Sequence, residues 1–506
     1  MKISNLFKIS SNILVSRISG LFRDILFANF LGASLLSDAF MFAFRLPNLF
    51  RRILAEGVTN SVFIPLYLEQ KSNSDLDSKK FYSLITVLFI LITGFMSLIF
   101  FFQTEKIISF LAPGFLREDF LLNSTISLVR ITFPFLILAS LSSLFSSILN
   151  ANNSFFIPSF LSVILNTTMI ITLLIFKENS HFELAWCILI SGLIQLILVF
   201  INIKILKLTF VFSFSISEKL IISLKKFFIR LLQAILGSGI VQLNIFISMI
   251  FASLVGAGAI SQIYYADRII DLPFALIAVA ISTTLLPYLS KNINDMKKTS
   301  EAFNKSIIFC LIFAAPSTLG LLIISDEIIS VLFGRGKFTE DDILITSSIL
   351  SIYSFSLPAY MLARMLNQIF YSYQKVYLPI LASIPTFLLN FLLCFMLYEK
   401  FGVRGLAFSS VVSVYLNVII QICILKFTNK VFYKKLIFFN FIKIFKILIG
   451  LIGLSIALFI VEKINIHIHY VDLICKMTLG IFTYFIILFF LKLDELNILL
   501  KRHSFN

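Results

Sequence analysis

Apolar residues recur along this chain in runs long enough to cross a lipid bilayer, separated by shorter polar segments. A transmembrane helix needs about 20 predominantly apolar residues, whereas the strands of a membrane barrel alternate apolar and polar residues over roughly ten positions. The runs here are longer than such strands. The pattern predicts an all-α polytopic membrane protein with about fourteen transmembrane helices, at 8–30, 35–66, 80–102, 121–149, 155–176, 184–203, 231–254, 258–289, 306–325, 343–372, 376–398, 405–425, 447–461 and 473–491.

Composition agrees with a membrane protein. Of the 506 residues, 59% are hydrophobic and 13% are charged, and the mean hydropathy is +1.00. Soluble domains carry about 25% charged residues, so a soluble globular protein is excluded. The five cysteines are scattered without paired or metal-ligand spacing, so neither a disulfide framework nor a metal or other cofactor is expected. Arginines interrupt the first apolar run, which predicts a retained helix and not a cleaved signal peptide.

Positive charge is distributed unequally between the two sides of the predicted membrane. When charges at helix ends are counted with the adjoining loops, 25 of the 42 lysines and arginines fall on the side of the N-terminus and nine on the opposite side. The positive-inside rule then places both termini in the cytoplasm. The net charge of +16 is explained by lysines that contact the anionic lipids of the inner membrane, and no nucleic-acid partner is expected.

The eight remaining cations fall inside predicted helices, and all are arginines. Each costs about 2.5–3.5 kcal/mol at the membrane centre, so eight facing lipid would cost more than the typical stability of a whole domain. They are expected to face a polar interior, a carboxylate or the interface. Arginine is always charged, and its planar fork suits phosphate. Two of the eight stand apart and are expected to snorkel toward the interface: Arg130 and Arg364.

Two explanations of the other arginines remain open. One is internal ion pairing with an acid, and the candidates are Asp24, Asp38, Glu56, Asp267 and Asp271. The other is a shared anion-binding surface, favoured because the first two helices hold five arginines and only three acids. At 100° per residue, Asp38, Arg45, Arg52 and Glu56 lie within about 40° of one another on a continuous helix.

The two halves of the chain resemble each other at an offset of 221–224 residues. The segment 105–111 (EKIISFL) matches 326–332 (DEIISVL), and Leu-Gly-Ala at 31–33 matches Val-Gly-Ala at 255–257. An even number of helices separates the matches, so both halves have the same orientation, as in transporters built from parallel repeats. A duplicated channel would show the same symmetry. The repeat predicts two six-helix lobes and two extra C-terminal helices with a tail, at 1–218, 219–430 and 431–506.

Several motifs resemble the MurJ/MviN family: SRISGLFRD at 16–24, RLPNLFRRILAEG at 45–57, APGF at 112–115 and YYADR at 264–268. The likeness covers the first twelve predicted helices in order. It implies a flippase of the MOP superfamily that moves lipid II, an undecaprenyl-pyrophosphate-linked peptidoglycan precursor, across the bacterial inner membrane for cell-wall biosynthesis. The two C-terminal helices would form a groove for the lipid tail, although they match only in hydropathy.

The resemblance also implies roles for individual residues. A cationic central cavity would bind the substrate through Arg17, Arg23, Arg45, Arg51, Arg52 and Arg268. Supporting or gating roles would fall to Ser16, Asp24, Asp38, Glu56, Ser261 and Asp267. The chain departs from the family where Val-Tyr-Leu-Pro at 376–379 replaces a common Lys-Thr-Pro turn, so a role for that lysine does not carry over. Alternating access is expected, driven by membrane potential, sodium or protons.

Other functions remain open from the sequence alone. An exporter of a different polyprenyl-pyrophosphate-linked oligosaccharide would use the same arginines, because they bind the shared pyrophosphate. A drug exporter for cations would be expected to carry acids in the first lobe instead. An enzyme acting on the same lipid usually needs a positioned base or nucleophile, but the four histidines fall in loops or in the tail. Transient contacts with the cell-wall synthesis machinery also stay open.

Overall fold

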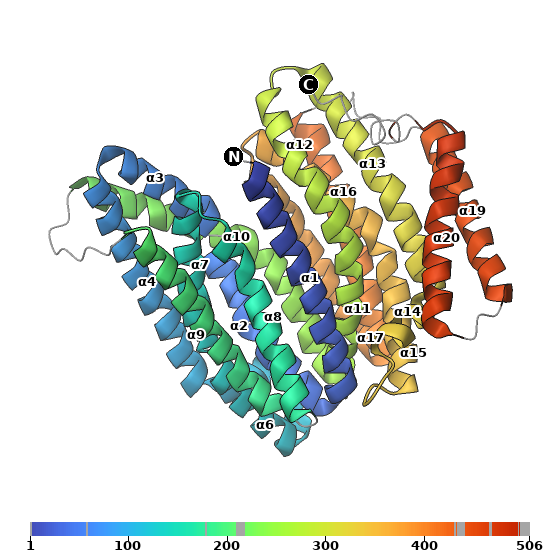
Figure 1. Cartoon of the computed structure of the whole chain (residues 1–506), viewed down its shortest axis with the longest axis horizontal. Coiled ribbons are helices and arrows are strands. Elements are labelled where there is room, and N and C mark those ends of the chain that lie inside the picture. The colour runs from blue at the N-terminus through green and yellow to red at the C-terminus, as the bar shows by residue number, and fades with distance from the viewer. Residues whose placement is uncertain are drawn as a thin grey trace. The chain divides into compact units, whose positions relative to one another are not determined.

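The structure, a computed structural model, describes residues 3–56, 59–177, 180–208, 218–429, 432, 441–464, 468–493 and 495. The described chain is helical and contains no strand (Figure 1). The elements of the first half are α1 (Ile3–Leu31), α2 (Leu35–Arg51), η1 (Arg52–Glu56), η2 (Thr59–Phe63), α3 (Ile64–Asn73), α4 (Asp75–Phe102), α5 (Thr104–Leu111), η3 (Pro113–Arg117), α6 (Asp119–Thr132), α7 (Phe135–Ala151), α8 (Phe156–Phe176) and α9 (His181–Ile205).

The second half repeats this order of elements. Its elements are α10 (Glu218–Val255), α11 (Ala259–Phe274), η4 (Ala275–Val279), α12 (Ala280–Lys291), α13 (Met296–Ile323), α14 (Ser325–Phe333), α15 (Glu340–Ser354), α16 (Ser356–Ser372) and α17 (Tyr377–Thr428), followed by α19 (Phe441–Ile464) and α20 (His469–Phe490). The π-helical turns η1 and η4 begin 223 residues apart, each after an in-helix proline, Pro47 or Pro273. The duplication predicted from the sequence is confirmed in the order of the elements.

Within the described residues, length and composition alone identify nine or ten candidate membrane spans. Nine described helices are long and apolar enough to span a membrane, or ten if the bent pair α15 and α16 forms one span. The 52-residue α17 contains a break at Gly402, where φ is 54°. Unbroken, it would measure about 78 Å at 1.5 Å per residue, more than twice the roughly 30 Å hydrocarbon core. The two predicted spans at 376–398 and 405–425 lie on either side of this break, and the total of fourteen stays a prediction.

The chain divides into two compact units, Met1–Ser261 with Arg335–Phe338, and Gln262–Gly334 with Thr339–Asn506. These units follow packing, whereas the predicted lobes follow the sequence repeat. The long helix α10 distinguishes them, because it opens the second repeat and yet belongs to the first unit. The lobe boundaries at 218 and 430 therefore stay predictions.

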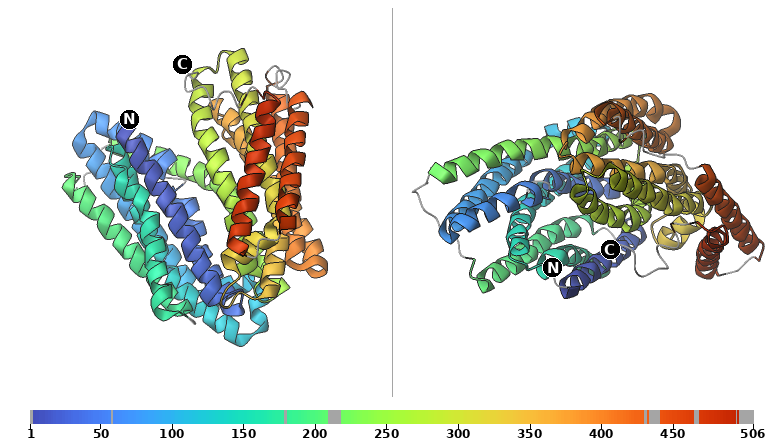
Figure 2. Two further views of the ribbon diagram at one scale, coloured as in Figure 1. Left: turned by 45° about the vertical axis from the view of Figure 1, so that its right-hand side comes forward. Right: turned by 90° about the horizontal axis from the view of Figure 1, so that it is seen from above.

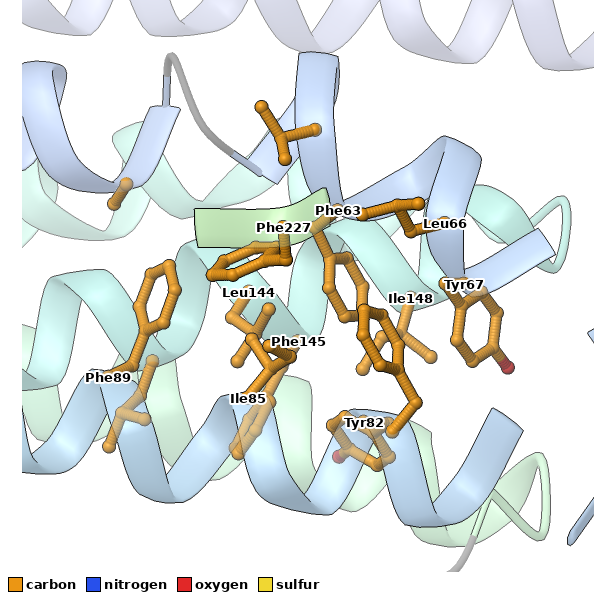
Figure 3. Close-up of a cluster of buried hydrophobic side chains, with 14 of the residues drawn as sticks. Phe63, Leu66, Tyr67, Tyr82, Ile85, Phe89, Leu144, Phe145, Ile148 and Phe227 are labelled. Carbon is orange, nitrogen blue, oxygen red and sulfur yellow. The ribbon is translucent and has the colours of Figure 1, made fainter. Parts of the chain in front are cut away.

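The interior of the first unit contains a cluster of buried aromatic and aliphatic side chains (Figure 3). Phe63 stacks on Phe81 with ring centroids 6.0 Å apart, and Phe227 of α10 meets the edge of Phe81 at 6.4 Å. Tyr82 meets Phe145 of α7 edge-on at 6.0 Å. These contacts join α4, α7 and α10 to the π-helical turn that precedes α3. Burial of these rings stabilises the packing of these helices against one another.

Two loops of the first unit dock on helix ends in a reciprocal way. The N–H of Gly114, in η3, donates to Ser253 Oγ at 3.2 Å, and Arg117 donates to the Leu254 carbonyl at 3.1 Å, at the end of α10. The N–H of Lys337 donates to the Asn29 carbonyl at 2.9 Å, near the end of α1. Because α1 and α10 correspond in the repeat, as do the two loops, each half supplies a loop to the first helix of the other.

Lys476 ties the C-terminal hairpin of α19 and α20, the two red helices that run side by side in Figure 2, to α14 of the second unit. Lys476 of α20 is 3% exposed and lies 2.9 Å from Glu327 of α14, 2.7 Å from Glu462 of α19 and 3.0 Å from Asp472. In the charge count from the sequence, Lys476 falls with the outer loops. That placement is wrong, because Lys476 lies inside α20 and is a buried cation with three carboxylate partners.

Candidate functional site

The first helix presents two arginines in different settings. Arg17 is exposed on α1 beside the exposed Leu14 and Ile18. Among the described residues it has no ion pair or hydrogen bond. Its neighbour Ser16 is half-buried, and the Ser16 carbonyl accepts a hydrogen bond from Asn166 of α8 at 3.1 Å. Arg17 is therefore available to an external anion, and Ser16 belongs to the contact between α1 and α8.

Arg23 is buried within the first unit. Its Nε and Nη2 donate to Asp24 Oδ1 at 3.0 and 2.6 Å, and its Nη1 donates to Asn166 Oδ1 at 2.9 Å. The guanidinium also lies over the rings of Phe27 and Phe44, at 5.3 and 5.7 Å from their centroids. Arg23 and Asp24 thus form an internal ion pair, which is one of the two explanations that the sequence left open for the arginines. The pair is buried within α1, and the Arg23 hydrogen bond to Asn166 links it to α8.

The arginines of α2 follow a helix that differs from the predicted one. The expectation of a continuous helix over 35–66 is wrong, because α2 ends at Arg51 and a π-helical turn runs from Arg52 to Glu56. The N–H of Arg52 still bonds the Asn48 carbonyl as in an α-helix, so the α-helical spacing holds as far as Arg52. A π-helix bonds each residue to the fifth beyond it, so the spacing assumed for Glu56 changes in the turn that follows, and its alignment with Asp38, Arg45 and Arg52 stays a prediction. Arg45 and Arg51 are half-buried, Arg52 is exposed, and the Glu56 side chain lies outside the described residues.

Asp38 has partners other than the arginines. It is buried in the first turn of α2, and its Oδ1 accepts hydrogen bonds from the N–H of Ser261 at 2.8 Å and from the Ser261 hydroxyl at 2.6 Å. Ser261 lies in the first turn of α11, where unpaired N–H groups and the helix dipole favour a carboxylate. Within the described chain, no hydrogen bond or ion pair joins Asp38 to an arginine. Asp38 and Ser261 therefore join α2 to the start of α11.

The remaining predicted residues belong to the second unit. Arg268 of α11 is half-buried, donates to the Tyr264 hydroxyl at 3.0 Å and lies 4.8 Å from the centroid of the Tyr264 ring. Asp267 is half-buried. Arg364 donates to Ser282 Oγ at 3.3 Å, and Arg130, in the first unit, is exposed and lies over Phe101. Because Arg268 and the arginines of α1 and α2 belong to different units, their convergence on one cavity stays a prediction.

A polar pocket that the sequence did not predict lies among α2, α7, α8 and α9 in the first unit. Its volume is about 340 Å³, at the lower end of the roughly 300–1,000 Å³ typical of ligand pockets. Arg51 lies at the pocket, and its Nε donates to Asn48 Oδ1 at 3.3 Å. Serines dominate the rest of the lining: Ser142, Ser143, Ser146, Ser147 and Ser162. The signal in the sequence that could have indicated it is the repetition of serine on α7 at helical spacing.

No group of three metal-ligating side chains occurs in the described part of the chain. A family model described as "Lipid II flippase MurJ" matches residues 27–491. The chain belongs to the MurJ family. MurJ proteins are described as flippases, so the family is one of membrane transporters and not of enzymes, and the chain is a multi-pass membrane protein.

Relatives and solved structures agree with this family. A "Probable lipid II flippase MurJ" of Buchnera aphidicola from Acyrthosiphon pisum is 34% identical over 477 residues, covering 90% of this chain and 89% of the relative. The corresponding protein of Aquifex aeolicus is 36% identical over 422 residues, covering 80% and 81%. A solved "Lipid II flippase MurJ, inward closed conformation" matches with a TM-score of 0.76 and 27% identity, covering 95% of this chain and 97% of that one.

A more distant structural match shows the superfamily fold. An inward-facing MATE multidrug transporter of the MOP superfamily matches with a TM-score of 0.66 at 13% identity, covering 85% of this chain and 99% of that transporter. At this identity the match shows the fold alone. The MurJ-family chain therefore has the MOP architecture that its resemblance implied.

Proposed function

We propose that this MurJ-family chain flips lipid II from the cytoplasmic to the periplasmic leaflet of the bacterial inner membrane, for cell-wall biosynthesis. Membership of the family supports the transport activity and the substrate. The observation that carries the role of the arginines is Arg17, which is exposed on a helix of the membrane domain with no carboxylate partner among the described residues. A fixed positive charge in that setting favours a phosphate-bearing ligand.

The proposed mechanism is alternating access. Arg17, Arg45, Arg51 and Arg52 of the first unit, with Arg268 of the second, hold the pyrophosphate of the headgroup while the lipid tail stays in the bilayer. Charge-assisted hydrogen bonds replace the water that the pyrophosphate loses. Arg23 takes a positioning role in this proposal, because its hydrogen bond to Asn166 holds α1 against α8 and thereby fixes the helix that carries Arg17.

Membrane potential is a sufficient driving force for this cycle. Each negative charge moved outward from a negative interior gains about 2.3 kcal/mol per 100 mV. The return of an empty, positively charged site toward the cytoplasm gains energy from the same field. With both termini in the cytoplasm, as the distribution of lysine and arginine indicates, the arginine-rich end of α2 lies on the side where the lipid precursor is made.

The proposal is tested by complementation in cells depleted of their own lipid II flippase. Arg17→Ala is expected to abolish growth, because it removes the exposed cation from α1. Arg130→Ala is the control, since Arg130 is also an exposed arginine of the first unit and contacts the backbone and ring of Phe101. Equal growth of both variants would contradict the role of Arg17. Failure of the unmodified chain to support growth, at normal membrane abundance, would contradict lipid II transport itself.

A further inference from the structure

The serine-lined pocket of the first unit has the chemistry of a site for a neutral, hydrogen-bonding ligand. Its polar lining consists mainly of hydroxyl and amide groups, which both donate and accept. The amides come from Asn48, Asn150 and Gln195, and the single cation is Arg51. Among the described residues that line the pocket there is no carboxylate. A cation site would be expected to carry acids, and a phosphate site would be expected to carry several cations or backbone N–H groups.

Ser146 provides a second and independent observation. Ser146 lines the pocket and is 8% exposed, but its Oγ is itself buried and has no hydrogen-bond partner in the described structure. Serines in membrane helices usually bond to the carbonyl three or four residues earlier, as Ser142 does to Leu138 and Ser147 does to Ser143. An unpaired buried hydroxyl is costly, and each such group in a native protein calls for a partner. A rotation about χ1 turns the Ser146 hydroxyl toward the pocket, where a ligand would supply the missing partner.

The size and the wall of the pocket agree with one sugar ring. A volume of about 340 Å³ lies at the lower end of the range of ligand pockets, which suits a group of the size of one sugar ring. The apolar part of the lining includes Phe135, Leu161 and Leu165, and the rest is rich in hydroxyl groups. Sugars present the same combination, with hydroxyl or amide groups at the ring edge and an apolar face. Arg51 at the pocket places a positive charge beside the position of such a ring.

We propose that this pocket binds a sugar of the lipid-linked headgroup, through Ser146 and its neighbouring hydroxyl and amide groups, while Arg51 contacts the adjoining pyrophosphate. This inference rests on the proposed function, since it assigns a subsite to the substrate of the flippase. It adds a basis for distinguishing lipid II from a polyprenyl pyrophosphate without sugar, which the arginines alone do not distinguish. The subsite lies wholly within the first unit.

The test compares the affinities of the purified full-length protein for lipid II and for undecaprenyl pyrophosphate, which has no sugar. Ser146→Leu fills the pocket and is expected to weaken lipid II binding about tenfold, equivalent to about 1.4 kcal/mol, with undecaprenyl pyrophosphate unaffected. Ser146→Ala removes the hydroxyl without adding bulk, and a loss of severalfold is expected for lipid II alone. Melting temperatures are measured for every variant.

Ser140→Ala is the matched control. Ser140 is on the same helix, is fully buried and likewise has no hydrogen-bond partner among the described residues, but it does not line the pocket. The affinity of the Ser140→Ala protein for both lipids is expected to be unchanged. If the Ser146→Ala and Ser146→Leu proteins bind lipid II as the unmodified protein does, the sugar site is refuted and the flippase function stands.

Two other outcomes would also overturn the inference. An equal loss of affinity for both lipids in the Ser146 variants would assign the pocket to the pyrophosphate. Failure of the unmodified protein to bind lipid II would overturn the proposed function together with the subsite. The two failures are therefore distinguishable.

Discussion

Replacement of Lys476 by methionine would test whether the buried cation holds the C-terminal hairpin to the second unit. Methionine is an unbranched side chain one heavy atom shorter than lysine, and it removes the charge. The change leaves three carboxylates without their shared partner, and their exposed fractions differ: 16% for Asp472, 30% for Glu327 and 62% for Glu462. The two less exposed acids are expected to account for most of the loss of stability, because water solvates Glu462 readily.

The expected loss in the free energy of unfolding follows from these exposed fractions. Removal of one partner of a buried ion pair costs about 3–5 kcal/mol, whereas an exposed pair contributes about 0–1 kcal/mol. Since Lys476 is buried and its partners are only partly so, we expect a loss of about 3 kcal/mol. For a domain of 150–250 residues this corresponds to a fall in melting temperature of roughly 6–12 °C.

The assay is thermal unfolding of the purified protein in detergent, with Lys79→Met as the control. Lys79 forms an i,i+4 pair with Asp75, in which the acid is 66% exposed, so its loss is expected to cost less than about 1 kcal/mol. Glu327→Gln is expected to destabilise more than Glu462→Gln. Equal melting temperatures for the Lys476→Met and Lys79→Met proteins would refute the argument that burial makes the Lys476 contacts strong.

Three further predictions concern the first and second units. Arg23→Lys keeps the charge but loses part of the fork that bonds Asp24 and Asn166, and is expected to lower the free energy of unfolding by about 2 kcal/mol, measured by thermal unfolding. Gly114→Ala drives a Cβ into the Ser253 carbonyl and should destabilise by about 1–3 kcal/mol, with faster hydrogen exchange in η3; Gly94→Ala, with no atom within 4 Å of its Cβ, should not. Tyr484→Phe removes a 2.8 Å hydrogen bond to the Ile312 carbonyl and should cost about 1 kcal/mol; an unchanged melting temperature would contradict that value.

The arginine-rich block shows how far the sequence predicts the candidate site. Arginines in apolar helices had to be paired or functional, because lipid does not solvate them. The sequence could not say which alternative holds for each. Arg23 meets Asn166 from 143 positions away, and Asp38 meets Ser261 from 223 positions away. Such residues come together only when the helices pack, so neither contact could be predicted from the local sequence pattern.

The polar pocket and Lys476 show the same limit. The serines of α7 are visible in the sequence, but a pocket forms only where α2, α8 and α9 close around them. Lys476 resembled a loop residue because it lies near a predicted helix end, and its burial depends on acids from α14 and α19. In both cases the chemistry of one helix depends on which neighbours pack against it.

The sequence by itself determined the all-helical membrane fold, the duplication and the family. These features depend on local hydrophobicity and on repeated motifs, and the bilayer requires helices whose backbone hydrogen bonds are satisfied within each segment. The tertiary structure decided the π-helical break after Arg51, the burial of Arg23, the partner of Asp38 and the position of the pocket. Each of these depends on side chains that are distant along the chain and adjacent only after the helices pack.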